Sequence, residues 1–275
     1  MSRTTVVLLL FLITGSCIKK QSDRFVSING RNQHILELGS GTPIVVFVHG
    51  FGNDLTSFTQ VQKEISNVTH TVSYDRAGFG KSELLDSARS MKHYVDELNA
   101  ILEKESMQSP YLLVGHSWGG HIIRYFSHVY PEKVAGLFLI DPSVEDLDEE
   151  LRKLYGDAAV YTYDSLYEHY YNPTWSEGNK RDQTYFRRNE LTMKEVKFSD
   201  SIPVTILSAT TRQNGVAIFR ESARMVNDLH KRWQEEAPHM RYVAVPNSGH
   251  AIQIDQPALV VSEIKSMMET LRKNQ

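Results

Sequence analysis

The amino-acid sequence predicts an α/β protein in which a mostly parallel sheet is covered by helices on both faces. Two patterns lead to this prediction: short, continuously apolar runs, and intervening segments with apolar residues at helical spacing. Residues 44–48 and 134–140 fit strands that are buried on both faces. Residues 91–105 place their apolar side chains on one side of a helix. Of the 275 residues, 41% are hydrophobic, which suffices for one large core.

The other elements are predicted from the same periodicities and from turn residues. Asn29-Gly30 separates two alternating segments and predicts a hairpin. Strands are expected at residues 25–29, 33–38, 44–48, 70–74, 111–114, 134–140, 204–207 and 241–245. Helices are expected at residues 55–68, 91–105, 218–236 and 257–271, and from the 115–119 motif to about residue 130.

Residues 144–201 break this rhythm. The segment is acidic at first and then rich in tyrosine, with helical pieces but no buried-strand pattern. We expect a helical lid inserted over the carboxyl edge of the sheet, on a core formed by residues 25–143 and 202–275. The tyrosines, which carry both apolar area and a hydroxyl, form either the interior of the lid or the lining of a pocket.

The N-terminus predicts an export signal. Arg3 precedes an apolar run at residues 6–13, which is too short to cross a bilayer with about 30 Å of hydrocarbon as a helix. Such a run suits a secretory signal peptide. Removal of residues 1–16 would leave Cys17 as the first mature residue, and residues 17–24 would form a polar tether.

Cys17 is the only cysteine, so no internal disulfide can form. It follows Gly15 and Ser16, and this arrangement resembles the lipobox of bacterial lipoproteins, although Thr14 stands where an aliphatic residue is commoner. The resemblance implies acylation of Cys17 and a cell-envelope lipoprotein whose only membrane contact is this anchor. The alternative is a plain signal peptide with a coincidental cysteine, which also leads to export.

Residues 115–119 read Gly-His-Ser-Trp-Gly, directly after an apolar strand and before a helical pattern. In this context a serine is held on a sharp turn with its hydroxyl exposed. The pattern alone is weak, because it recurs by chance in roughly one chain of this length in ten. Residues 49–52, Asp141 and His250 also follow predicted strands directly. We therefore expect these residues and Ser117 to converge at the edge where parallel sheets bind ligands.

Four segments in this order resemble the α/β-hydrolase superfamily. They are His49-Gly50-Phe51-Gly52, residues 75–82, residues 115–120 and Gly249-His250. The resemblance covers residue 25 to the C-terminus. It implies Ser117 as nucleophile, His250 as general base, and an oxyanion hole formed by the backbone amides of Trp118 and Phe51.

The acid of the triad departs from the commonest family pattern. Most members carry it after the strand that corresponds to residues 204–207, but residues 208–215 contain no carboxylate. Asp141 ends the preceding strand, a position that some members use, and we predict Asp141 as the acid. The alternative is that Asp141 is a capping or loop residue and that Ser117 and His250 act as a dyad.

Other polar residues near these segments are expected to support the structure. His116 and His121 flank Ser117 and should pack internally, and His49 should lie under the oxyanion loop. We expect Asp75 and Arg76 to pin their own glycine-rich loop through a local ion pair. His169 lies in the lid, where solvent exposure is the commoner fate.

The sequence thus predicts a serine hydrolase that cleaves a carboxylic ester or related acyl compound through a covalent acyl-enzyme. Serine at position 117 excludes the aspartate attack used by relatives that dehalogenate or open epoxides. Trp118 also resembles the residue at this position in dehalogenases and proline iminopeptidases. One alternative is an amidase or aminopeptidase, in which the acidic residues at 145–150 bind a substrate amine. A silent binding protein on the same fold is another.

Cofactors and macromolecular ligands are not expected. The net charge of −3 provides no basic field for nucleic acid. No spacing of His, Cys and Asp suits a metal, and no glycine-rich loop suits a phosphate. The expected partner is a small-molecule acyl substrate, and the oligomeric state is left open.

Overall fold

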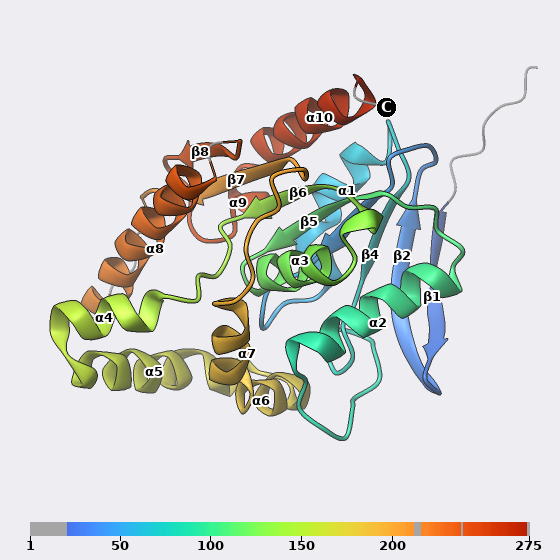
Figure 1. The fold of residues 1–275 in the computed structure, drawn as a ribbon. Coiled ribbons are helices and arrows are strands. Elements are labelled where there is room, and N and C mark those ends of the chain that lie inside the picture. Colours follow the sequence, from blue (N-terminus) through green and yellow to red (C-terminus); the bar gives the residue numbers. More distant parts are fainter. Residues whose placement is uncertain (1–20, 212–215, 238, 274–275) are drawn as a thin grey trace, which may run out of the picture.

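The computed structural model describes residues 21–211, 216–237 and 239–273 (Figure 1). Cys17 and the predicted signal peptide lie outside the described residues. Eight strands form one sheet in the order β1-β2-β4-β3-β5-β6-β7-β8. Strand β2 pairs antiparallel with β1 and β4, and all other neighbours are parallel. The predicted mostly parallel α/β sheet is confirmed.

The elements follow the predicted order. The strands are β1 (Gln21–Ile28), β2 (Arg31–Leu38), β3 (Val45–Val48), β4 (Thr71–Tyr74), β5 (Tyr111–His116), β6 (Val134–Ile140), β7 (Val204–Ala209) and β8 (Arg241–Val245). The core helices are α1 (Thr59–Ile65), α2 (Met91–Lys104), α3 (Trp118–Val129), α8 (Ala217–Glu236), α9 (Ile252–Asp255) and α10 (Pro257–Lys273). Among the described residues, no helix combines the length and apolarity needed to cross a membrane.

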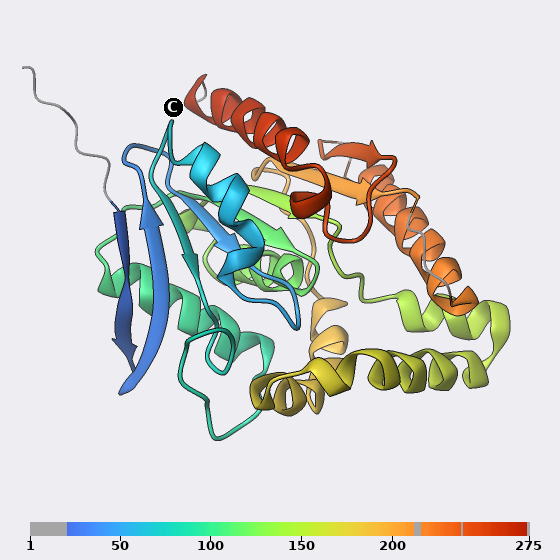
Figure 2. The same cartoon turned by 180° about the vertical axis from the view of Figure 1, so that it is seen from behind.

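Helices cover both faces of the sheet, as the apolar runs require. Buried side chains of α2, α3 and α8 pack against one face and form one hydrophobic cluster. Those of α1, α9 and α10 form a second cluster against the other face. Figures 1 and 2 show these two layers from opposite sides.

The first strand begins earlier than expected. β1 starts at Gln21, so residues 21–24, which were assigned to the tether, belong to the sheet. This part of β1 is polar and lacks the apolar alternation that marks a strand. Its side chains are held instead by polar contacts: Asp23 lies 2.6 Å from His34, and Arg24 forms an ion pair with Glu37 at 2.7 Å. These partners come from β2 and are not adjacent in sequence.

Four helices separate β6 from β7: α4 (Leu147–Tyr155), α5 (Asp157–Tyr171), α6 (Glu177–Gln183) and α7 (Phe186–Met193). They lie together along the lower edge of the molecule in Figure 1, and we call them the lid helices. Asp182 pairs with the buried Arg89, which also lies 3.3 Å from Glu97. Asn189 accepts from the Met91 amide and donates to the Arg89 carbonyl, both at 2.9 Å. Buried polar contacts therefore attach α6 and α7 to the start of α2.

His121 on α3 is fully buried, as predicted. Neither of its ring nitrogens has a hydrogen-bond partner among the described residues, and its ring meets Trp118 edge-on at 5.2 Å. Burial lowers the pKa of His121 from 6.5 to about 3. The imidazole is therefore neutral in the folded protein at ordinary pH.

This shift predicts a loss of stability in acid. The unfolded chain binds the His121 proton below about pH 6.5, whereas the folded protein binds it only near pH 3, so stability falls across this window. His121→Phe should reduce the loss between pH 7 and pH 4 by about 3 kcal/mol. Urea unfolding of both proteins at the two pH values measures this difference. Equal acid losses in the two proteins would contradict it.

Candidate active site

Ser117 lies at a sharp turn between β5 and α3. Its φ of 51° and ψ of −117° are neither helical nor extended, and such a backbone persists only where its surroundings hold it. The motif glycines permit the close contacts that do so. A Cβ on Gly119 would lie 2.1 Å from the Val48 carbonyl oxygen, and one on Gly115 would lie 2.6 Å from the Gly119 oxygen. α3 therefore begins directly against β3 and β5, and Ser117 remains partly exposed.

Asp141 and His250 lie together at the carboxyl edge of the sheet. His250 Nδ1 is 2.7 Å from Asp141 Oδ2. The Asp141 side chain is fully buried, whereas that of His250 is 45% exposed. The other carboxylate oxygen, Oδ1, accepts a hydrogen bond from the Ala209 amide at 3.3 Å. Both oxygens of Asp141 are thus engaged, and the Nε2 side of His250 is directed away from the acid.

The residue before Ser117 links the turn to the loop that carries His250. His116 Nε2 donates to the His250 carbonyl at 3.0 Å, and the two rings lie 4.7 Å apart. On the other side of this loop, the Gly249 amide donates to Asp255 Oδ2 at 2.7 Å. His116 is buried and holds the loop, in agreement with a structural role.

Arg76 binds the backbone of the predicted oxyanion loop. Its buried guanidinium donates to the carbonyls of His49 and Gly50, the latter at 2.9 Å. Its backbone N–H donates to His49 Nε2 at 3.3 Å. Burial, followed by the charge of Arg76, lowers the pKa of His49 well below its ordinary value, so this ring is neutral and able to accept.

The predicted ion pair between Asp75 and Arg76 is wrong. Within the described residues, the Asp75 carboxylate accepts instead from His34 Nδ1 at 2.7 Å and from the Leu55 and Lys81 amides at 2.8 and 2.9 Å. The sheet places β2 and its His34 beside Asp75, which frees the guanidinium to reach the neighbouring loop. Nothing in the sequence indicated that Asp75 would bind His34 or that Arg76 would bind the backbone of the His49 loop.

The amides of Phe51 and Trp118 donate no hydrogen bond within the described part of the chain. Trp118 is the first residue of α3, where backbone N–H groups have no acceptor in their own helix. The peptide unit of Phe51 follows Gly50, which touches the turn: a Cβ on Gly50 would lie 3.2 Å from Ser117 Cβ. One unengaged donor, on Trp118, therefore directly follows Ser117, and the other, on Phe51, follows a residue that packs against Ser117.

Lid side chains cover the aromatic rings of these two residues. Phe186, the first residue of α7, stacks on Trp118 at 4.2 Å between ring centroids and meets Phe51 edge-on at 5.8 Å. Trp175 also meets Phe51 edge-on, at 5.2 Å. Trp118 is 1% exposed. The lid is closed over this side of the turn.

The acidic segment at residues 145–150 is occupied by ion pairs. The pairs are Glu145–Arg124, Asp146–Lys194, Asp148–Arg187, Glu149–Lys194 and Glu150–Arg232. The first is buried and bidentate, with distances of 2.8 and 2.9 Å. These carboxylates hold the lid helices to one another, to α3 and to α8.

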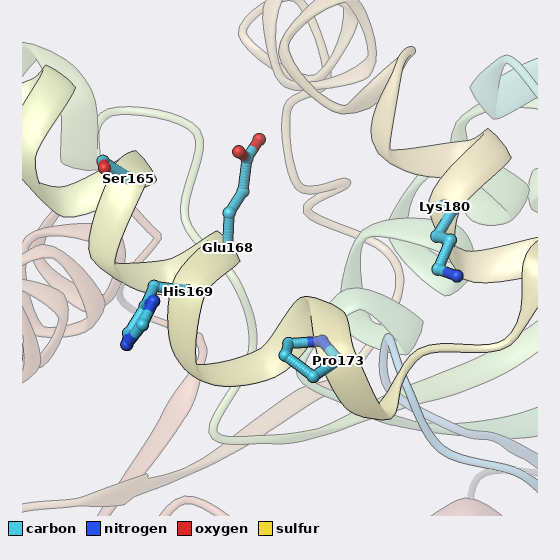
Figure 3. Close-up of a pocket in the computed structure, with 5 residues that line it drawn as sticks. All are labelled: Ser165, Glu168, His169, Pro173 and Lys180. Atoms are coloured by element: carbon cyan, nitrogen blue, oxygen red, sulfur yellow. The ribbon is translucent and has the colours of Figure 1, made fainter.

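A cavity of about 440 Å³ lies in the lid, between α5 and α6 (Figure 3). Its lining residues are Ser165, Glu168, His169, Pro173 and Lys180. Ser117, Asp141 and His250 do not line it. His169 is exposed and belongs to this outer cavity.

Comparison with known proteins places this chain in a family. The family described as alpha/beta hydrolase fold matches residues 43–220. The soluble epoxide hydrolase of Corynebacterium sp. is 23% identical over 284 residues, which cover 89% of this chain and 96% of that protein. The (lyso)-N-acylphosphatidylethanolamine lipase of Bos taurus is 33% identical over 127 residues, which cover 43% of this chain and 37% of that protein.

Solved structures show the same fold. Epoxide hydrolase A from Mycobacterium thermoresistibile superposes with a TM-score of 0.71 at 17% identity, covering 91% of this chain and 98% of that one. The family match spans well over half of the sequence and includes the Ser117 turn and Asp141. The chain therefore belongs to the α/β-hydrolase fold family.

Proposed function

We propose that this protein is a serine hydrolase that cleaves a carboxylic ester through Ser117, His250 and Asp141. One observation carries the proposal: His250 Nδ1 lies 2.7 Å from the buried Asp141 carboxylate, at the edge of the sheet where the Ser117 turn lies. A buried carboxylate at Nδ1 selects the tautomer that accepts a proton at Nε2, and it stabilises the imidazolium that then forms.

The reaction follows the two-step acyl-enzyme route. Ser117 Oγ attacks the ester carbonyl carbon while its proton passes to His250 Nε2. The tetrahedral intermediate then collapses, and the same proton goes to the departing alcohol. Water attacks the resulting acyl-enzyme in the second step, with His250 again accepting and returning a proton, and the carboxylic acid is released.

The Phe51 and Trp118 amides are the proposed oxyanion donors. Trp118 directly follows Ser117, Phe51 follows Gly50 beside the turn, and neither amide has an acceptor within the described residues. Donors that are held in place before the reaction stabilise charge that develops only in the transition state, and each contributes about 3 kcal/mol. The Arg76 guanidinium supports this loop by binding the carbonyls of His49 and Gly50.

Ester chemistry fits the residues better than the reactions of some relatives. Several proteins that resemble this chain are named epoxide hydrolases, but Ser117 stands where such enzymes use an aspartate. The similar lipase acts on an acyl lipid according to its name. The carboxylates at residues 145–150 are already paired with arginine and lysine side chains. This pairing argues against their binding a substrate amine.

Two active-site variants test the chemistry against a silent binding protein. Ser117→Ala should abolish labelling by a fluorophosphonate probe and lower turnover of 4-nitrophenyl butyrate by about 10⁴-fold or more. Asp141→Asn should lower kcat by about 10⁴-fold, because the amide no longer orients the imidazole correctly. Ser127→Ala, on the same helix α3, is the control and should retain labelling. Labelling that survives Ser117→Ala, or full activity of Asp141→Asn, would contradict the proposed triad.

The contacts of Phe186 over Trp118 and Phe51 predict that the lid hinders the entry of long-chain esters. Each aromatic pair contributes about 0.5–1.5 kcal/mol, and Phe186 makes two of them, with Trp118 and Phe51. Phe186→Ala should therefore favour the open lid and raise kcat/KM for 4-nitrophenyl laurate relative to the acetate by about tenfold. Leu191→Ala, at an exposed position of the same helix α7, is the matched control. An unchanged laurate-to-acetate ratio in Phe186→Ala would remove Phe186 from this role.

We also propose export and lipid anchoring through Cys17. The proposal rests on the signal-like run at residues 6–13 and on Gly15-Ser16-Cys17. Incorporation of radiolabelled palmitate in a bacterial host should be lost in Cys17→Ser, and the protein should move from the membrane fraction to the soluble fraction. Absence of palmitate incorporation from the wild-type protein would leave the plain signal peptide as the explanation, and incorporation that persists in Cys17→Ser would exclude Cys17 as the acylated residue.

A further inference from the structure

The end of β7, where the triad acid is most often found, carries a buried polar network. Ser208 is fully buried and its hydroxyl lies 2.8 Å from Nδ1 of His230, which is also fully buried on α8. The same hydroxyl contacts the Asn227 side-chain oxygen. His230 Nε2 lies 2.9 Å from the Pro142 carbonyl oxygen. A carbonyl can only accept, so Nε2 carries a proton and donates it to Pro142.

This network surrounds the turn that carries Asp141. Asp141 has a φ of 43°, a conformation that a non-glycine residue keeps only when neighbours hold it. Its amide donates to the Leu207 carbonyl at 2.7 Å, and its Oδ1 accepts from the Ala209 amide at 3.3 Å. Asn227 in turn donates to the Ala209 carbonyl at 2.9 Å.

Both flanks of the acid are therefore tied to the same helix. The Pro142 side is bonded to His230, and the Ala209 side is bonded to Asn227. Trp233 packs on the His230 ring at 5.4 Å and limits its rotation. If the bond from His230 were lost, the strained peptide after Asp141 could relax, and the carboxylate would move relative to His250.

We propose that His230 is a positioning residue for the triad acid. It holds the Pro142 carbonyl, and thereby the Asp141 turn, so that Oδ2 faces His250 Nδ1. This inference rests on the proposed function of Ser117, Asp141 and His250. In this arrangement the acid follows β6. Strand β7 supplies the Ala209 amide, which binds the carboxylate, and the Ser208 hydroxyl, which contacts His230.

The test measures whether His230 acts through Asp141. His230→Leu should lower kcat for 4-nitrophenyl butyrate by about 10- to 100-fold, as misplacement of a catalytic group by about 1 Å does, with KM changed less than about twofold. In an Asp141→Asn background, His230→Leu should cause almost no further loss, because there is no carboxylate left to position. The rate of fluorophosphonate inactivation provides the readout for the slow variants.

Two further variants separate positioning from packing. His230→Gln retains a side-chain N–H that can reach the Pro142 carbonyl, and it should recover at least a third of the kcat lost in His230→Leu. Leu229→Ala, also buried on α8, should lower the urea midpoint while retaining kcat. If His230→Leu fails to fold, Ser208→Ala, which removes the partner of His230 Nδ1, replaces it in both backgrounds with the same expected pattern of losses.

The outcomes are distinct. Equal fractional losses from His230→Leu with and without Asp141→Asn would overturn the positioning role, as would wild-type kcat in His230→Leu. Failure of the proposed function has a different signature, since wild-type protein would then show no fluorophosphonate labelling that depends on Ser117.

Discussion

The contact on which the site depends is the approach of α3 to the sheet at Gly119. A Cβ there would lie 2.1 Å from the Val48 carbonyl oxygen, so only glycine allows the helix to begin so close to β3. This approach forces Ser117 into its strained turn and points the start of α3, with the unengaged amide of Trp118, at the hydroxyl. The same contact places the end of β3, and hence Phe51, next to the turn. The positions of the proposed nucleophile and of both proposed oxyanion donors therefore depend on one steric contact.

The other parts of the site are held by buried polar side chains that lie outside the proposed triad. Arg76 binds two carbonyls of the proposed oxyanion loop, and His230 binds the carbonyl of Pro142, the residue after Asp141. Burying such groups is costly unless each is paired. Their common effect is to hold the backbone of the loops that carry the proposed oxyanion donor and the proposed acid. Donors and acids that are already in place need little reorganisation during the reaction, which is the condition for strong electrostatic catalysis.

The lid helices are attached to the rest of the protein by ion pairs and aromatic contacts. They carry many exposed ion pairs, which contribute little each, and a few buried ones such as Arg124–Glu145 and Arg89–Asp182. Over the turn itself the lid presents aromatic rings, with Phe186 on Trp118. Three ring contacts join the lid to the residues around Ser117: Phe186 with Trp118 and with Phe51, and Trp175 with Phe51. Aromatic contacts near Ser117 and ion pairs elsewhere in the lid are compatible with the proposed entry of an apolar acyl group.

The sequence by itself determined the order and type of the sheet's elements, and it led to Ser117 as the proposed nucleophile, because apolar period and glycine spacing are local properties. It also led to Asp141 and His250, since both follow strand ends that meet at one edge of a parallel sheet. It did not reveal that β1 starts at Gln21, that Arg76 serves the loop of His49, or that His230 reaches Pro142. Only the tertiary structure decided these contacts. Each joins polar groups that are distant in the chain, and hydrogen-bond partners, unlike apolar faces, leave no periodic pattern in the sequence.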